Sequence, residues 1–549
     1  MGGARVEGVT EPRPDRPVAF RAVSSRSSGW PALIAVIPLA VPLLRLLLVW
    51  PQVWLWGDQA LIDVNTSRVV GGHTLLGPYS RYGWHHPGPM WFWWLAPFRL
   101  LTHASPTALV AAYLAQGVIL VVLIVVVTRR LLGLRAAWIM AGLLIAFVWS
   151  FGYQRLLLLW SPYAMALPAL LLMLSAATFA VTRRPWLPLL AMAMVGSFMV
   201  QTDISTSIVV GTVCLAAAAC RLAAWRAGAL QGEASTHHRH RWVAPVLVGL
   251  ALAVVWAPPL YQQFVQPPGN VRLVKQFAEG DQGPRSGVRQ GLRAVNSIVA
   301  GYPSRLGEDG QGHDADPATI QDGWGWRIGI VYVAGGALLA VAAWRRGDRR
   351  RSALAVISVT AVIGAYLSGA QVTGPLYPYL LYWTQIVVVP LWLLAAERVL
   401  ALIQTRSPVL VRARAVRIGA VAVIAASACI VASTSFDQPV ATGSSVDIAR
   451  SSWRLVEGAV TDPDVETVTI RLSSLNAGPV AAAIADQAVR RGRSVGFSPE
   501  FAFLVDADFV GSTHPDLELY VRSSLDPPAP PDQYQLIGSV GGFEIYGRR

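Results

Sequence analysis

One carboxylate stands where a polar loop leaves a predicted membrane segment. Asp58 follows an apolar run over residues 31–50 that is long enough to cross a bilayer. A carboxylate there can act as general base for an acceptor hydroxyl that lies within hydrogen-bond reach. Asp63 lies five residues later, which separates the two side chains by about 140° around a helix. The spacing therefore favours a single base, Asp58, over a pair of carboxylates.

Polar side chains near the same boundary have the chemistry to bind a phosphorylated lipid. Arginine suits bidentate binding of phosphate, and the external cation candidates are Arg81, Arg155, Arg272 and Lys275. Asp203 ends a predicted span, where an acid usually faces a cavity or a partner. We predict that the donor-binding residues are Arg81, His85, His86, Asp203, Gln262, Gln263, Arg272 and Lys275.

Most of these residues also have a purely structural interpretation. Asp58 could be the N-cap of the helix that follows it, and Asp63 is more typical of a solvated or salt-bridged helix residue. Asp203 could simply be paired with a neighbour. The two glutamines and the cations after them fit an ordinary amphipathic surface helix equally well. Adjacent histidines point in different directions, so only one of His85 and His86 is expected to face a site.

The composition indicates an integral membrane protein. Of 549 residues, 54% are hydrophobic and 14% are charged, whereas soluble domains carry about 25% charged residues. Roughly eleven segments approach the length of a membrane-spanning helix, namely 31–52, 106–128, 136–152, 162–182, 186–203, 204–224, 242–260, 326–344, 352–370, 378–402 and 416–434. We predict an α-helical polytopic membrane protein of about eleven transmembrane helices.

The distribution of arginine predicts the orientation of these helices. Arginines gather in alternate connections, at 129–135, 183–184, 226–241, 345–351 and 406–417. The positive-inside rule places these loops in the cytoplasm, together with an N-terminal segment, 1–29, that we expect to be disordered. The core over 30–434 then has external loops at 53–105 and 261–323. We predict a multi-pass plasma-membrane protein in contact with the membrane lipids, and a C-terminal region, 435–549, outside the cytoplasm.

The C-terminal region has a different pattern from the core. VETVTIRL, SVGFS and LELYVRS are typical of strands, AGPVAAAIADQAVRRG of an amphipathic helix, and YQLIGSVGGFEIYGRR of a hairpin. This order predicts a small α/β domain. It contains no nucleophile elbow and no metal-ligand cluster, so a lid or a module that positions an acceptor is favoured over independent catalysis.

Other function classes lack their signatures. The net charge of +14 resides mainly in the predicted cytoplasmic loops, so the inner leaflet, and not nucleic acid, is the expected partner. The three cysteines, Cys214, Cys220 and Cys429, fall in predicted spans and suit small buried hydrophobes. There is no CxxC pair and no Walker sequence.

Three motifs resemble those of the GT-C superfamily of polytopic glycosyltransferases. They are Gly57–Asp58, the segment GPYSRYGWHHPGP from Gly77 to Pro89, and the loop from Pro258 to Asn270. The chain is similar to the protein O-mannosyltransferases and aminoarabinose transferases, and especially to an actinobacterial branch, over residues 30–430. This resemblance implies a polyprenyl-phosphate-linked sugar as donor, catalysis on the outer face and Asp58 as base.

The sequence departs from that family at one position. Many relatives have a second acid directly after the first, and here Gln59 occupies that position. Divalent ions prefer several carboxylate oxygens, so we assign no metal ligands, although a divalent metal cofactor stays open. The same departure leaves open whether the chain is active.

The motifs and the composition together lead to one predicted function and two alternatives. We predict an inverting membrane glycosyltransferase that moves a sugar from a polyprenyl-phosphate donor to a cell-envelope glycan, lipid or protein. A lipid or small-solute transporter is the first alternative, although transporters tend to show duplicated halves, and no internal repeat is present. A catalytically inactive envelope scaffold is the second.

Overall fold

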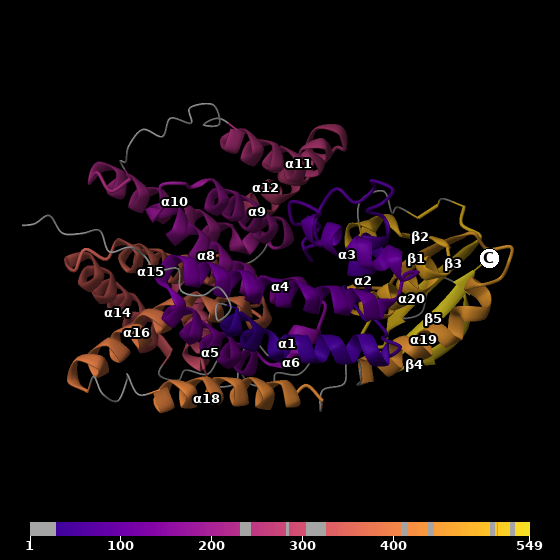
Figure 1. Ribbon diagram of the computed structural model, residues 1–549. Helices are drawn as coiled ribbons and strands as arrows, with labels where there is room; N and C mark the ends of the chain where they lie inside the picture. Colours follow the sequence, from indigo (N-terminus) through magenta and orange to yellow (C-terminus); the bar gives the residue numbers. More distant parts are fainter. Residues whose placement is uncertain are drawn as a thin grey trace, which may run out of the picture.

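The computed structural model describes residues 29–230, 243–280, 285–303, 325–407, 414–436, 444–505, 511–512, 514–526 and 533–548. A bundle of long helices makes up most of the molecule, and a small sheet with two helices lies at one end of it (Figure 1). The predicted N-terminal segment 1–29, except Gly29, and residues 304–323 of the second external loop lie outside the described residues.

Ten helical stretches in the described part of the chain are long and apolar enough to cross a membrane. They comprise α1 (Trp30–Val49), α4 (Pro106–Leu132), α5 (Leu134–Phe151), α7 (Ser161–Ala164) with α8 (Ala166–Val181), η2 (Ile204–Thr206) with α10 (Ser207–Arg226), α11 (Val243–Val265), α14 (Gly325–Arg345), α15 (Arg349–Ala370), η6 (Tyr382–Val388) with α16 (Val389–Arg406), and α18 (Arg414–Ser433). The eleventh predicted span is the shorter apolar helix α9, Trp186–Thr202. The prediction of a polytopic helical membrane protein is therefore confirmed.

The bundle is built around α8, which is buried over most of its length. A helix that is apolar on all sides belongs in the centre of a bundle, and α8 packs against α4, α9, α10 and α15. Small residues allow the closest approaches. A Cβ on Gly364 of α15 would lie 3.1 Å from the Cα of Val209 on α10.

Shorter helices occupy the end of the bundle near the sheet. They include α2 (Asp58–Ser67) and α3 (Met90–Leu101) in the first predicted external loop, α6 (Tyr153–Leu157), α12 (Asn270–Glu279), α13 (Gly287–Gly301) and η5 (Pro378–Leu380). Figure 1 shows α2 and α3 between the bundle and the sheet. The loop between α2 and α3 carries three of the polar candidates, Arg81, His85 and His86.

The C-terminal region forms the predicted α/β unit. Its elements are α19 (Ser444–Val460), β1 (Thr467–Leu472), η7 (Leu475–Ala477), α20 (Gly478–Arg490), β2 (Ser494–Phe497), η8 (Pro499–Leu504), β3 (Leu517–Ser523), β4 (Gln535–Val540) and β5 (Phe543–Arg548). The strand order is β2-β1-β3-β5-β4. β1 pairs in parallel with β2 and β3, whereas β5 is antiparallel to β3 and β4. The predicted strands, helix and hairpin are all present, and α19 is an addition that we did not predict.

Candidate active site

A cavity of about 550 Å³ lies where the bundle meets the C-terminal unit. Its polar and aromatic lining comes from segments far apart in the sequence: Asp58, Tyr79, Ser80, Arg81, Tyr82, Trp84, His86, Trp160, Ser161, Asp203, Ser205, Ser207, Phe277, Ser368, Gln371, Thr373, Tyr377, Tyr379 and Asn476. A cavity of this size can hold a small ligand with convergent polar groups. Of the nine predicted site residues, Asp58, Arg81, His86 and Asp203 line it.

Asp58 is held in the cavity by two hydrogen bonds. The Tyr79 hydroxyl donates to its Oδ1 at 2.6 Å, and the Trp160 indole Nε1–H donates to its Oδ2 at 2.7 Å. Asp58 is the first residue of α2, and Gly57 occupies the cap position with φ of 52°, which glycine adopts readily. No side-chain hydrogen bond caps this helix. The alternative interpretation of Asp58 as an N-cap is therefore wrong, and its carboxylate is available to a ligand in the cavity.

The two donors are themselves fixed by local structure. Tyr79 lies in a narrow turn in which the N–H of Gly77 donates to the carbonyl of His86 at 2.8 Å. The Trp160 ring lies against Tyr379, with 4.5 Å between the ring centroids. Burial and the adjacent charge of Asp58 raise the pKa of Tyr79 well above its ordinary value. The phenol therefore stays protonated and keeps donating to the carboxylate.

Arg81 is the cation of the cavity among the described residues. Its Nη2 donates to the carbonyl of Thr373 at 3.3 Å and to the Tyr82 hydroxyl at 3.1 Å. The guanidinium lies 5.0 Å from the ring centroid of Tyr82 and 5.3 Å from that of Tyr377. Every hydrogen bond that the structure gives this side chain starts from Nη2, so the other nitrogens can bind an anion.

His86 and Asp203 form a further part of the wall, at the junction of α9 and η2. The Ile204 N–H donates to Nδ1 of His86 at 3.0 Å, and the Ser205 N–H donates to Oδ1 of Asp203 at 2.9 Å. Burial lowers the pKa of His86, although the nearby charge of Asp203 opposes this effect. The imidazole is therefore neutral near pH 7, accepts through Nδ1 and carries its proton on Nε2.

The other five predicted residues do not line this cavity. His85 binds Asn270 through its backbone, with bonds of 2.9 and 2.7 Å. Gln262 and Gln263 accept the N–H groups of Asn270 and Val271 at the start of α12. Arg272 and Lys275 are exposed on that helix, where Lys275 pairs with Glu279 at 3.7 Å. α12 contributes an aromatic ring, Phe277, to the cavity wall instead.

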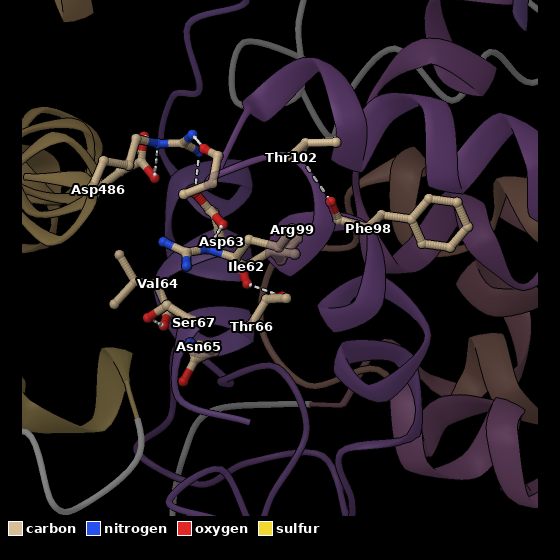
Figure 2. A network of polar contacts seen from close by, with 12 residues as sticks. Ile62, Asp63, Val64, Asn65, Thr66, Ser67, Phe98, Arg99, Thr102 and Asp486 are labelled. Atoms are coloured by element: carbon tan, nitrogen blue, oxygen red, sulfur yellow. Dashed lines mark hydrogen bonds and ion pairs between the residues drawn. The ribbon is translucent and has the colours of Figure 1, made fainter. Parts of the chain in front are cut away.

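Asp63 belongs to a buried ion network away from the cavity (Figure 2). Its Oδ1 accepts the Arg99 Nε–H at 2.7 Å, and its Oδ2 pairs with Arg490 of the C-terminal helix α20. Arg490 also pairs with Asp486 at 3.0 Å. Burial works to raise the pKa of Asp63, but the charges of Arg490 and Arg99 hold it below its ordinary value. Asp63 is therefore a salt-bridged residue, and one that joins α2 to the C-terminal unit.

Metal-binding residues were sought throughout the described part of the chain. No group of three or more His, Cys, Asp or Glu side chains there could hold an ion. Arg155, the remaining cation candidate, is buried and lies with its guanidinium 4.4 Å from the ring centroid of Tyr382.

Two solved structures are similar to this chain over almost its entire length. One is the crystal structure of ArnT from Cupriavidus metallidurans in the apo state, with 12% identity, a TM-score of 0.53 and coverage of 95% of this chain and 98% of that one. The other is the same protein bound to undecaprenyl phosphate, with 13% identity, a TM-score of 0.57 and the same coverage. This chain has the fold of ArnT. No family model and no curated protein matches the sequence.

The likeness to the two ArnT structures confirms the predicted architecture, a polytopic helical bundle with a small α/β unit at its C-terminal end. The structure also identifies cavity residues that were not predicted from the sequence. Tyr79 lies inside a motif that we had singled out, but Trp160, Tyr379 and Asn476 lie in unrelated segments. No spacing rule connects them to Asp58. Only the tertiary structure identifies them.

Proposed function

We propose that this ArnT-like protein is an inverting membrane glycosyltransferase that uses a polyprenyl-phosphate sugar. The observation that carries the proposal is the placement of Asp58 in a cavity with Arg81, its one cation among the described residues, on the fold of a protein solved with undecaprenyl phosphate. The carboxylate and the cation match the two needs of the reaction, a base for the acceptor and a counter-charge for the leaving phosphate.

The proposed chemistry is a single displacement. The acceptor hydroxyl oxygen forms a bond to the anomeric carbon while the bond from that carbon to the phosphate oxygen breaks. Asp58 takes the hydroxyl proton, and the electron pair leaves with polyprenyl phosphate. Tyr79 and Trp160 hold the carboxylate with both hydrogen bonds, which orients it before the reaction begins. Arg81 binds the phosphate, because a guanidinium pairs well with its oxygens.

We further propose that the cavity opens to the outer face. α4 begins at Pro106, near the C-terminal unit, and carries Arg129 and Arg130 at its other end. The connection from α14 to α15, residues 345–351, lies at that same far end of the bundle (Figure 1). The positive-inside rule makes the arginine-rich end cytoplasmic, so the cavity and the sheet lie outside. The acceptor is then a molecule of the cell envelope.

The test is turnover of a panel of polyprenyl-phosphate sugars by protein in nanodiscs. The readout is release of polyprenyl phosphate, with thermal shift as a separate measure of donor binding. Wild type and the surface variant Asp464→Asn should release it from one donor, whereas Asp58→Asn should bind that donor and release at least 100-fold less. Equal release by Asp58→Asn would overturn the assignment of the base. Donor binding without release by wild type would favour the scaffold or transporter interpretation.

A further inference from the structure

The C-terminal unit supplies one wall of the catalytic cavity. Leu475, Asn476, Gly478 and Pro479, from the start of α20 and the turn before it, line the cavity together with Leu504. These residues lie at least 417 positions after Asp58 in the sequence, yet they share its cavity. Among the described residues of this wall there is no cation, and one amide, Asn476, is the polar side chain.

Contacts on several sides hold this wall against the helix that carries Asp58. α20 packs along α2, and a Cβ on Gly57 would lie 3.7 Å from the Cβ of Pro479. The rings of Trp56 and Phe543 meet edge-on with centroids 6.3 Å apart. The Asp63–Arg490 ion pair joins the same two helices. The position of the wall relative to Asp58 is therefore fixed by packing and by charge.

A carboxylate inside the C-terminal unit shapes the turn. Asp526 accepts hydrogen bonds from the hydroxyls of Ser473 and Ser474 and from Nδ2 of Asn476, the last at 3.2 Å. The backbone N–H of Asn476 donates to the Ser474 Oγ at 3.0 Å. The bond from Nδ2 to Asp526 fixes the orientation of the Asn476 side-chain amide. The structure gives its Oδ1 no hydrogen bond within the described residues, so that oxygen can accept from a ligand.

The distribution of charge in the cavity indicates which side binds the donor and which side binds the acceptor. The phosphate requires a cation, and Arg81 lies on the side formed by the bundle. In an inverting displacement the attacking oxygen approaches the anomeric carbon opposite the leaving phosphate. The described residues of the C-terminal wall carry no charge, which suits a hydroxyl-bearing acceptor that needs a hydrogen-bond acceptor and apolar surface but no counter-charge.

From this arrangement, and resting on the proposed function, we infer that residues 475–479 are the acceptor-binding wall and that Asn476 determines specificity for a sugar hydroxyl of the acceptor. Its Oδ1 accepts a hydrogen bond from that hydroxyl, and Asp526 positions the amide. Neither residue takes part in the binding of the polyprenyl phosphate.

The test separates acceptor binding from donor binding. The donor is the polyprenyl-phosphate sugar that wild type turns over, and the acceptor probes are octyl β-glucoside, β-mannoside and β-galactoside in nanodiscs. Three quantities are measured: the acceptor KM, the donor KM, and release of polyprenyl phosphate without acceptor. Losing a neutral hydrogen bond of about 0.5–1.5 kcal/mol predicts that Asn476→Ala raises the acceptor KM by roughly 2- to 12-fold. The donor KM and the acceptor-free release should change less than about twofold.

Two further variants complete the design. Gln535→Ala removes an exposed amide of β4 that does not line the cavity, and should leave all three quantities unchanged. Asp526→Asn should raise the acceptor KM as Asn476→Ala does, with normal hydrogen exchange in β1 and β3 as evidence of folding. An unchanged acceptor KM in Asn476→Ala, or equal losses for donor and acceptor, would overturn the inference. So would a wild type that hydrolyses the donor but glycosylates none of the glycosides. A wild type inactive on every donor would instead count against the proposed function itself.

Discussion

Replacing Arg490 by methionine tests whether the buried ion network holds the C-terminal unit on α2. The Arg490 side chain is 10% exposed, and its partners Asp63 and Asp486 are 0% and 1% exposed. It also donates to the carbonyl of Ala104. Without it, Asp63 keeps its pair with Arg99, whereas Asp486 loses the ion pair that the structure gives it within the described residues. Methionine keeps most of the volume of the side chain and removes only the charge and the donors.

The expected cost is large at a pH where the Asp486 carboxyl is ionised, because its charge is then left unpaired. Removing one partner of a buried ion pair costs about 3–5 kcal/mol, and about 1.4 kcal/mol corresponds to a tenfold change in an equilibrium constant. Opening of the α2–α20 contact should therefore become about 100- to 4,000-fold more frequent. Arg491 offers a matched control, since it pairs with Glu457 at 3.1 Å with both side chains at least one-third exposed. An exposed pair contributes about 0.2–1 kcal/mol.

The loss should also depend on pH. Burial raises the pKa of Asp486 well above its ordinary value, the charge of Arg490 opposes this, and the charge of Asp63 adds to it. Removing Arg490 therefore raises that pKa further, so the docked state binds a proton that the open state does not. Stability of the variant is then highest at low pH and is lost as the pH rises through the raised pKa.

Hydrogen exchange measured by mass spectrometry on protein in nanodiscs is the assay. Amides of α2 and α20 should exchange faster in Arg490→Met, and the difference from wild type should grow as the pH rises. The transmembrane helices should be unaffected, and Arg491→Met should resemble wild type. If Arg490→Met and Arg491→Met exchange alike, the network does not hold the unit in place and the reasoning fails.

Three further predictions follow from the site. Trp160→Phe removes one of the two donors to Asp58. A hydrogen bond to a charged group contributes about 1.5–3 kcal/mol, so turnover should fall roughly 10- to 100-fold, and full activity would contradict the role of the indole. Burial lowers the pKa of His86 from 6.5. The neutral imidazole should therefore contribute its full stabilisation above pH 6.5, and this stabilisation should be lost as the pH falls through the lowered pKa. An imidazole NMR titration midpoint at or above 6.5 would contradict the prediction. Gly77→Ala would drive a Cβ into two backbone carbonyl oxygens, which should destabilise the folded protein by about 1–3 kcal/mol and lower its melting temperature. Gly211 has open space around it, so Gly211→Ala should leave the melting temperature unchanged.

Features that depend on interactions within a short segment were predicted from the sequence, whereas features that depend on contacts between distant segments were not. Membrane spans arise from local apolar runs, because each helix satisfies its own backbone in lipid. The strands and hairpin of the C-terminal unit were equally local. The candidate site was predicted only in part. Asp58 and Arg81 lie inside two motifs of one predicted loop and line the cavity. Gln262 and Gln263 also have the chemistry of a binding site, but they hold the start of α12 instead.

The sequence by itself determined that this is a polytopic helical membrane protein with a small α/β unit at its end. It also predicted one carboxylate at a membrane boundary, since hydropathy, periodicity and residue spacing are properties of short segments. Only the tertiary structure decided which side chains surround that carboxylate. Trp160 and Asn476 reach Asp58's cavity from 102 and 418 residues away, and the buried pairing of Asp63 with Arg490 holds the C-terminal unit there. Such contacts depend on how packed helices bring distant segments together, which no local pattern records.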